Sequence, residues 1–370
     1  MPRNLIIALL LCTLLLCTSA DKPKRKSSKI QIALLLDVSG SMAGLINQAK
    51  GQFWRMVNEL TKATRNGQNV RIELSILSYG GDTLAQNDYI QLHTLLTTDV
   101  DLVSTELFKL RDGGLSEYCG QAIQMAVDSL NWSPGKKDLK VIFIAGNEMF
   151  DQGNVDYRQA CKEARKRRII VNTVYCGSEQ LGVDELWASG AKIARGKYLQ
   201  INIDTTYQLA NTLWDDKIIE FNSRLNSTYI PFGDMGDKAL RRQKRSDENA
   251  MLLGNAYMRE RVMFKISEYY NNPHWDLVYT FNRDTSILSR LKKSELPLNM
   301  SAMTHKRRTR YLQEKQMERE VYQQGVRVYC EKAREFLISA GKEDGFTPSL
   351  DNSIINTIKE QGTALGYKFE

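Results

Sequence analysis

The chain has 370 residues, of which 42% are hydrophobic and 25% charged, with 24 glycines, 7 prolines and 6 cysteines. This balance is typical of a folded protein, and it excludes intrinsically disordered, collagen-like and disulfide-dense chains. The formal net charge is +8, a mild basic excess that favours anionic surfaces without naming a partner.

The first 20 residues have the pattern of a secretory signal peptide. Arg3 is followed by an almost wholly apolar run over residues 5–17, and small residues precede a cleavage point after Ala20. The run is shorter than the roughly 20 residues of a membrane-spanning helix. A lipoprotein anchored at Cys17 is the second interpretation, because the preceding leucines lack the small residue of such a cleavage site. We therefore expect an exported protein, in the periplasm, the cell envelope or the extracellular space, with a short basic linker over residues 21–28.

Four cysteines follow the predicted signal peptide: Cys119, Cys161, Cys176 and Cys330. Export makes disulfides possible, and four cysteines allow three full pairings. A bridge between Cys161 and Cys176 is one hypothesis. Buried free thiols are the alternative, and the sequence does not choose between them.

Residues 29–226 alternate apolar runs with amphipathic helical patterns. Strands are predicted at residues 30–36, 70–79, 90–96, 141–145, 169–174 and 197–201. Helices are predicted at residues 45–60, 102–110, 119–130, 156–167, 183–194 and 206–225, with Gly67 as the C-cap of the first and with the last closing the domain. Strands that are apolar on both faces and separated by helices predict a six-stranded, mostly parallel sheet covered on both sides. This is a doubly wound, Rossmann-like α/β fold, whose ligands bind at the carboxyl ends of the strands.

Residues 227–370 are expected to form a mainly helical C-terminal region. Helices are predicted at residues 249–270, 301–337 and 353–366, and an extended segment at residues 274–279. The runs at residues 241–245 and 306–310 are strongly basic. A solvated helix face is the simplest interpretation of these runs, and contact with anionic envelope polymers or lipid headgroups is the second. Nucleic acid is not expected as a partner of an exported protein.

The motif that carries chemistry follows the first predicted strand and reads Asp37-Val38-Ser39-Gly40-Ser41. One carboxylate and two hydroxyls emerge at alternating positions just before a helix. Such oxygen donors suit a hard divalent cation, namely Mg²⁺, Mn²⁺ or Ca²⁺. An ordinary helix cap is the alternative interpretation of the same residues.

An apolar strand, Asp-x-Ser-x-Ser and an amphipathic helix, set in a six-strand α/β pattern, resemble the von Willebrand factor A domain over roughly residues 29–226. The resemblance implies that Asp37, Ser39 and Ser41 hold the divalent ion of a metal-ion-dependent adhesion site. In that family the ion keeps one position open for a carboxylate of the partner. The chain as a whole looks like secreted bacterial proteins of this family.

Two further loops depart from that family pattern. Glu117 stands where the family has a threonine, and Gly146 stands where it has an aspartate. Glu117 is read as a longer oxygen ligand, with a first-turn helix glutamate as the alternative. Asn147 or Glu148 could supply the third-loop oxygen, although Glu148 could also be a solvated loop acid. If Asp37 and Glu117 both coordinate, the charge of the ion is largely cancelled, and its pull on a partner carboxylate weakens.

We expect a non-enzymatic binding or adhesion-type protein that recognises a protein or cell-envelope ligand through this metal site. The three histidines show no zinc-binding spacing, and no phosphate-binding loop motif occurs. A scaffold or assembly module with a non-functional metal site is the first alternative. A metal-dependent hydrolase, with Glu148 or Asp151 as general base, is the second. No transmembrane segment is predicted after residue 20, and the oligomeric state is left open.

Overall fold

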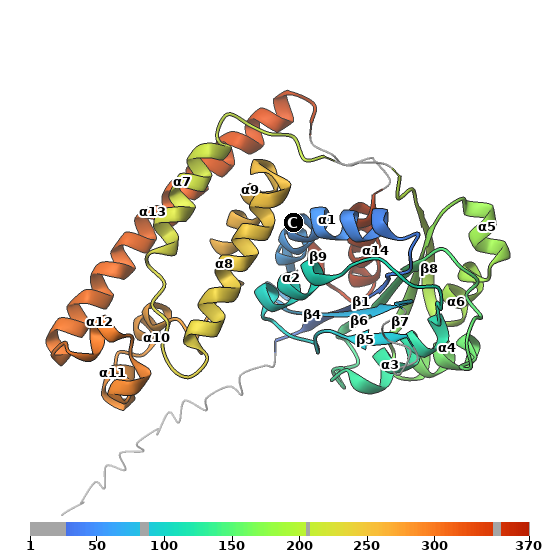
Figure 1. Ribbon diagram of the computed structural model, residues 1–370, viewed down its shortest axis with the longest axis horizontal. Coiled ribbons are helices and arrows are strands. Elements are labelled where there is room, and N and C mark those ends of the chain that lie inside the picture. The colour runs from blue at the N-terminus through green and yellow to red at the C-terminus, as the bar shows by residue number, and fades with distance from the viewer. Residues whose placement is uncertain (1–26, 82–88, 205–207, 343–348, 370) are drawn as a thin grey trace, which may run out of the picture.

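The structure is a computed structural model that describes residues 27–81, 89–204, 208–342 and 349–369. It contains an α/β part built on a sheet and an elongated helical part beside it (Figure 1). The predicted signal peptide and most of the predicted linker lie outside the described residues. Export therefore stays a prediction.

A six-stranded sheet with the strand order β5-β4-β1-β6-β7-β8 forms the centre of the α/β part. Its strands are β1 (Lys29–Asp37), β4 (Arg71–Tyr79), β5 (Ile90–Leu92), β6 (Leu139–Gly146), β7 (Ile170–Cys176) and β8 (Arg195–Ile201). Five strands run parallel, and the edge strand β5 is antiparallel to β4. Every residue of β6 is buried, since helices cover both faces of the sheet. The predicted doubly wound, mostly parallel sheet is confirmed.

Helices pack on both faces of this sheet. One face carries α3 (Cys119–Ser129), α4 (Tyr157–Lys166) and α6 (Trp187–Ile193), the last preceded by the short α5 (Glu179–Asp184), and the other face carries α1 (Ala43–Thr61), α2 (Val100–Lys109) and α14 (Leu350–Thr363). The helix predicted over residues 183–194 is divided because Leu186 adopts a left-handed backbone, with φ of 73°. Gly67 does not cap α1, which ends at Thr61. It lies instead in the turn between β2 (Ala63–Arg65) and β3 (Gln68–Asn69), with φ of 71°.

The helical part contains α7 (Asp215–Asn226), α8 (Gly236–Leu253), α9 (Asn255–Lys265), α10 (Leu277–Arg283), α11 (Ile287–Arg290), α12 (Leu298–Ser301) and α13 (His305–Ser339). The long helix predicted over residues 301–337 is confirmed as α13. The helix predicted over residues 249–270 is divided at Gly254, whose φ is 127°. The predicted extended segment at residues 274–279 is wrong, because the Asp276 side chain caps α10. Within the described ranges, no helix has the length and apolar run needed to cross a membrane.

The helix expected to close the sheet packs instead within the helical part. It begins at Asp215 as α7 and lies against α13 and α9. Its residues Ile218 and Leu225 are fully buried there. Phe221 approaches Gly325 of α13 so closely that a Cβ on this glycine would lie 2.4 Å from the ring. The prediction of a closing helix was wrong because amphipathic spacing marks an apolar face but not the surface that this face covers.

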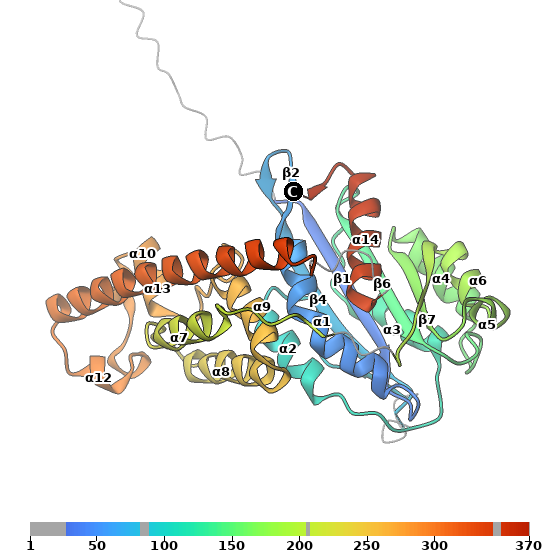
Figure 2. The same ribbon diagram turned by 90° about the horizontal axis from the view of Figure 1, so that it is seen from above.

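The C-terminal helix α14 covers the sheet where a closing helix was expected. It lies against α1 and near β6 and β8 (Figures 1 and 2). Ile354, Ile355 and Ile358 are buried in the same apolar cluster as the side chains of β1 on that face. The last strand, β9 (Lys368–Phe369), pairs with β2. The Tyr367 hydroxyl donates a 2.6 Å hydrogen bond to the carbonyl oxygen of Lys29, so the chain ends beside its first strand.

Buried charges join the helical part to the α/β part. Arg261 of α9 lies 2.8 Å from a carboxylate oxygen of Asp101 in α2 and 2.9 Å from one of Asp247 in α8. Its guanidinium also lies over the ring of Trp54 in α1, 4.4 Å from the ring centroid. Lys265 Nζ forms a further ion pair with Asp247, at 2.8 Å. Because removing one partner would leave a buried charge uncompensated, this cluster holds α8 and α9 against α1 and α2.

All four cysteines in the described residues are free thiols: Cys119, Cys161, Cys176 and Cys330. Cys161 packs in the apolar cluster formed by α3 and α4. Cys176 packs in the cluster on the opposite face of the sheet. The hypothesis of a Cys161–Cys176 disulfide is therefore wrong, because the sheet separates the two sulfur atoms.

Candidate metal site

The first loop of the candidate site leaves the carboxyl end of β1. The Asp37 side chain is fully buried, and its Oδ1 accepts a 2.7 Å hydrogen bond from the backbone N–H of Ser39. The Ser39 hydroxyl lies 3.4 Å from the hydroxyl of Ser41, which is exposed. None of the three side chains caps the following helix, because α1 has Met42 at its N-cap position and no side-chain cap hydrogen bond. The helix-cap interpretation of the motif therefore does not hold.

The second loop is held against the first by two backbone hydrogen bonds of 2.7 and 3.1 Å, which join residues 113–114 to residues 38–40. Glu117 follows this contact and is only 4% exposed. Its carboxyl lies within hydrogen-bonding reach of the Asp37 carboxyl and the Ser39 hydroxyl. Glu117 precedes α3 and is not part of its first turn, so the alternative interpretation of this residue does not hold either.

The third loop brings an amide rather than a carboxylate into the cluster. Asn147 Nδ2 donates a 3.2 Å hydrogen bond to Ser41 Oγ, and Gly146 has no side chain to offer. Glu148 is exposed, and its carbonyl oxygen accepts a 2.7 Å hydrogen bond from Trp187 Nε1. Its charge acts on the two buried carboxyls. Glu148 as a metal ligand stays a prediction.

Gly80, directly after β4, belongs to the site although the sequence analysis did not single it out. Its φ is +91°, and a Cβ there would lie 2.7 Å from Asp37 Oδ1 and 3.4 Å from Glu117 Cγ. The Asp37 carboxyl and the Glu117 side chain thus occupy the space that a side chain would fill at this position. A glycine pair immediately after a buried strand was the available signal in the sequence.

The two buried carboxyls carry more negative charge than their surroundings neutralise. Burial raises the pKa of Asp37 to about 6. Burial, together with repulsion from Asp37, raises the pKa of Glu117 to about 9. Asp37 Oδ2 is buried and accepts no hydrogen bond from a backbone N–H or an alcohol hydroxyl of the described residues. At neutral pH the pair therefore keeps a proton between its carboxyls, at a place where a cation would also relieve the repulsion.

The donor set fits a hard divalent cation. It consists of oxygen atoms only, from the carboxyls of Asp37 and Glu117, the hydroxyls of Ser39 and Ser41, and the amide of Asn147. Mg²⁺, Mn²⁺ and Ca²⁺ prefer such ligands. In the part of the chain that the structure describes, no group of three or more His, Cys, Asp or Glu side chains could hold a metal ion. The ligands that this site offers to a cation are therefore two carboxylates and several neutral oxygen atoms.

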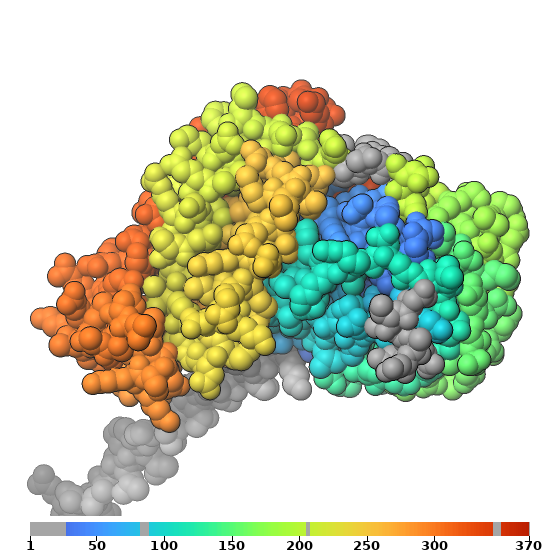
Figure 3. Space-filling view, viewed as in Figure 1, coloured from blue at the N-terminus to red at the C-terminus, as the bar shows by residue number. Residues whose placement is uncertain are grey.

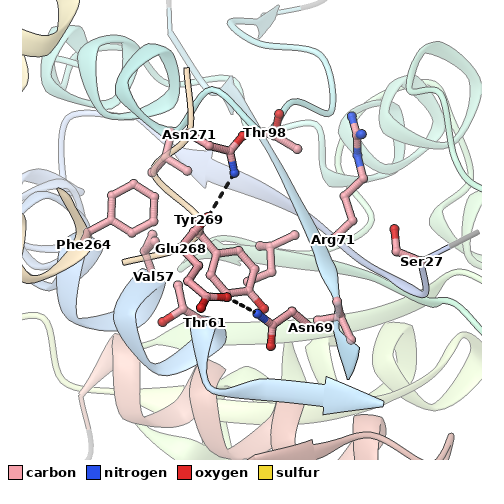
Figure 4. A pocket seen from close by; sticks show the side chains of 13 residues that line it. Ser27, Val57, Thr61, Asn69, Arg71, Thr98, Phe264, Glu268, Tyr269 and Asn271 are labelled. Carbon is pink, nitrogen blue, oxygen red and sulfur yellow. Dashed lines mark hydrogen bonds between the residues drawn. The ribbon is translucent and has the colours of Figure 1, made fainter. Parts of the chain in front are cut away.

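A second hollow, of about 330 Å³, lies at the opposite end of the sheet, between the start of β4 and the segment after α9 (Figure 4). Several of its polar side chains are already hydrogen-bonded to protein groups. Asn69 Nδ2 lies 2.7 Å from Glu268 Oε2, and Asn271 Nδ2 lies 3.0 Å from the Glu268 carbonyl oxygen. Arg71 is paired with Glu73 at 2.6 Å. With these groups paired, the carboxyl ends of the strands are the stronger candidate for a functional site.

Comparisons with known proteins place the same segment in one family. Residues 31–186 match the family model of the von Willebrand factor type A domain. No curated protein matches the chain. Among solved structures, BatB from Bacteroides thetaiotaomicron is 16% identical with a TM-score of 0.36, over 47% of this chain and 90% of that chain.

Two further solved structures have similar sequence identities and TM-scores. Proximal thread matrix protein 1 from the mussel byssus, solved with a zinc-occupied MIDAS motif, is 12% identical with a TM-score of 0.36, over 48% of this chain and 43% of that chain. The VWA domain of SpRpn10 is 14% identical with a TM-score of 0.35, over 49% of this chain and 90% of that chain. The identification rests on the family match at residues 31–186, which covers the first two loops and the third-loop residues of the candidate site. Residues 31–186 are therefore similar to the von Willebrand factor type A domain, a family that mediates protein–protein interactions, often through a divalent metal ion.

Proposed function

We propose that this protein is a non-enzymatic, exported binding protein, whose A-type domain recognises a protein or cell-envelope ligand through a divalent cation at the carboxyl ends of the strands. The observation that carries the proposal is the buried pair of Asp37 and Glu117. Two carboxyls are packed together with the hydroxyl of Ser39 beside them, and no cation of the described ranges compensates their charge. A bound cation would supply that charge and present a coordination position to a partner.

The ligand set also bears on the kind of partner. Asp37 and Glu117 together cancel the two positive charges of a divalent ion, and the exposed Glu148 adds negative charge near it. A like charge placed opposite an acidic group at an interface is unfavourable. We therefore propose that a partner carboxylate is bound less strongly here than the family pattern implies.

Calorimetric titration of the full chain tests the metal site. Mn²⁺, Mg²⁺ and Ca²⁺ are added in turn to wild type, to Asp37→Ala and to the matched surface variant Asp184→Ala. We expect saturable heat with wild type and Asp184→Ala, and none with Asp37→Ala. Absence of heat with wild type, or the same heat with Asp37→Ala, would reject the metal site. Glu148→Gln in the same series decides whether Glu148 is a ligand.

Partner capture from the source organism, with and without a chelator, tests the binding role. Release of the partner by chelator, and failure of Asp37→Ala to capture it, would support metal-dependent recognition. Retention of the partner in both cases would favour the scaffold alternative, in which the partner binds elsewhere. Turnover of a generic ester or phosphate ester that disappears in Asp37→Ala would instead favour the hydrolase.

A further inference from the structure

A concave basic surface lies where α8 passes α2, away from the candidate metal site. The hollow measures about 420 Å³ and is lined by Lys238, Arg241, Arg242, Lys244 and Arg245 of α8. Figure 3 shows α8, in yellow, beside α2, in teal, on the face turned toward the viewer. We call this surface the α8 basic groove.

The charges of the α8 basic groove are not balanced. Arg242 lies 2.6 Å from Asp99, and Arg245 lies 3.3 Å from Glu248. The other three cations of the groove make no hydrogen bond or ion pair with any residue in the described ranges. Five cations thus face two acids, and three positive charges are uncompensated.

Four of the five cations share one side of α8 because their positions follow the helical repeat, and Lys244 lies three residues after Arg241. Lys238, Arg241, Arg242 and Arg245 are spaced i, i+3, i+4 and i+7, which brings the Cβ atoms of neighbours within about 5–6 Å. Gln243 and other buried residues further along α8 lie on the opposite side of the helix and fix its orientation. The packing of α8 therefore presents the cations as a preformed set.

The shape of the groove bears on which anions can reach it. The Arg242 side chain is only 18% exposed and is held by Asp99, so it lies deeper than its neighbours. A flat lipid surface reaches such a recessed group less well than a single chain that can enter the hollow. Guanidinium groups donate two parallel hydrogen bonds to a phosphate, and each phosphate has several oxygens to share among closely spaced cations.

We propose that the α8 basic groove binds a free phosphate-bearing polyanion. Its successive phosphate groups would lie along α8 and neutralise Lys238, Arg241 and Lys244. The paired Arg242 and Arg245 would add hydrogen bonds. This surface is separate from the metal site, so the proposal does not depend on a bound cation.

Binding of inorganic polyphosphate to the full chain, measured calorimetrically in the presence of chelator, tests the proposal. The triple variant Lys238→Glu, Arg241→Glu, Lys244→Glu is compared with Lys306→Glu, Arg307→Glu, Arg310→Glu at the start of α13, which changes the net charge equally. A cation near an anionic membrane surface gains roughly a fivefold factor in affinity, and a similar factor for each of the three cations near polyphosphate predicts that affinity falls about 100-fold or more in the first variant. In the second it should fall no more than about threefold, because long-range effects between exposed charges are screened.

Three outcomes would overturn the proposal. One is an equal loss of affinity in both triple variants, and another is equal affinity of wild type for polyglutamate and polyphosphate. The third is binding to anionic lipid vesicles without binding to polyphosphate. If the glutamate variant does not fold, the corresponding triple alanine variant replaces it. It should bind polyphosphate about 100-fold more weakly than wild type, since it lacks the same three cations.

Discussion

The α-carbon of Gly146 lies against the carboxyl of Asp37, so that a Cβ at position 146 would stand 3.0 Å from Asp37 Oδ2. It would also stand 2.5 Å from the hydroxyl of Tyr79, which donates a 2.8 Å hydrogen bond to the carbonyl oxygen of Ala145. A close-packed interior does not absorb contacts this short without displacing its neighbours. The third-loop aspartate of the family pattern is therefore excluded here by packing.

Gly146→Ala should destabilise the protein by about 1–3 kcal/mol, because the added methyl group overpacks the site. Gly146→Asp should cost more and should not increase metal affinity. Urea unfolding midpoints measure the effect. Gly40→Ala is the matched control, because the nearest atom to its added Cβ is 3.9 Å away. An equally small loss at both positions would contradict the packing argument.

The hydroxyl of Tyr79 offers a second check on the same contact. Tyr79→Phe removes the atom nearest to the added methyl group, so Gly146→Ala should cost less in that background than in wild type. A double-mutant cycle on the unfolding free energies measures this coupling. Strict additivity would show that the strain lies elsewhere.

Metal-free protein should lose stability as the pH rises from about 5 to about 9. Unfolded Asp and Glu have pKa values near 4, whereas the pKa of Asp37 is about 6 and that of Glu117 about 9 in the fold. The folded state therefore keeps a proton that the unfolded state has released. The stability contributed by these groups is complete below about pH 4 and is lost as the pH rises through the two raised values.

Thermal melts in chelator across this pH range measure that loss. Glu117→Gln cannot ionise, so the fall in melting temperature should be smaller in this variant than in wild type by about 3 °C or more. The exposed Glu148→Gln should keep most of the slope. If the melting temperature of Glu117→Gln fell with pH as steeply as that of wild type, the raised pKa of Glu117 would not be the cause of the loss.

The sheet could be predicted from the sequence because its signal is local. Residues 141–145 are apolar at every position, which marks a strand covered on both faces, and β6 is buried throughout. Asp37 and Ser39 were also predictable, since they lie two residues apart in one loop. Glu117, which stands where the family has a threonine, lies beside Asp37, and its role as a metal ligand stays a prediction.

The rest of the site depended on which strands are neighbours. Gly80 faces Asp37 only because β4 lies beside β1, with Tyr79 in register with Asp37. Asn147 reaches Ser41 only because β6 lies on the other side of β1. That α14 covers the sheet could not be predicted either, because helical periodicity does not indicate which surface a helix packs against.

Arg319→Ala in the helical part should destabilise the protein by about 3–5 kcal/mol, because it leaves the buried carboxylate of Asp276 without its partner. Arg319 Nη1 lies 2.5 Å from Asp276 Oδ2, and its Nη2 donates a 2.6 Å hydrogen bond to the carbonyl oxygen of Thr228. Arg310→Ala is the control. It breaks a pair with Glu314 whose arginine side chain is 82% exposed, and should cost no more than about 0.5 kcal/mol. Chemical unfolding that gave similar small losses for both variants would show that the buried pair does not hold α13 in place.

Ile358→Ala tests whether α14 is part of the core of the sheet or an appendage to it. Ile358 is fully buried in the apolar cluster that includes β1 and β6, so its truncation should cost about 2–5 kcal/mol. Leu298→Ala is the matched control, because that side chain is 92% exposed. Its unfolding midpoint should stay close to that of wild type.

Amide hydrogen exchange followed by mass spectrometry separates the two possibilities for α14. Side chains of β1 and β6 pack in the same cluster as Ile358, so the loss of packing should be shared with them. Exchange should then accelerate in residues 29–37 and 139–146 as well as in α14, and should change less in α13. Faster exchange confined to α14 would mean that this helix can detach while the sheet stays folded, and the core would then have to be assigned to α1 and α2 alone on that face.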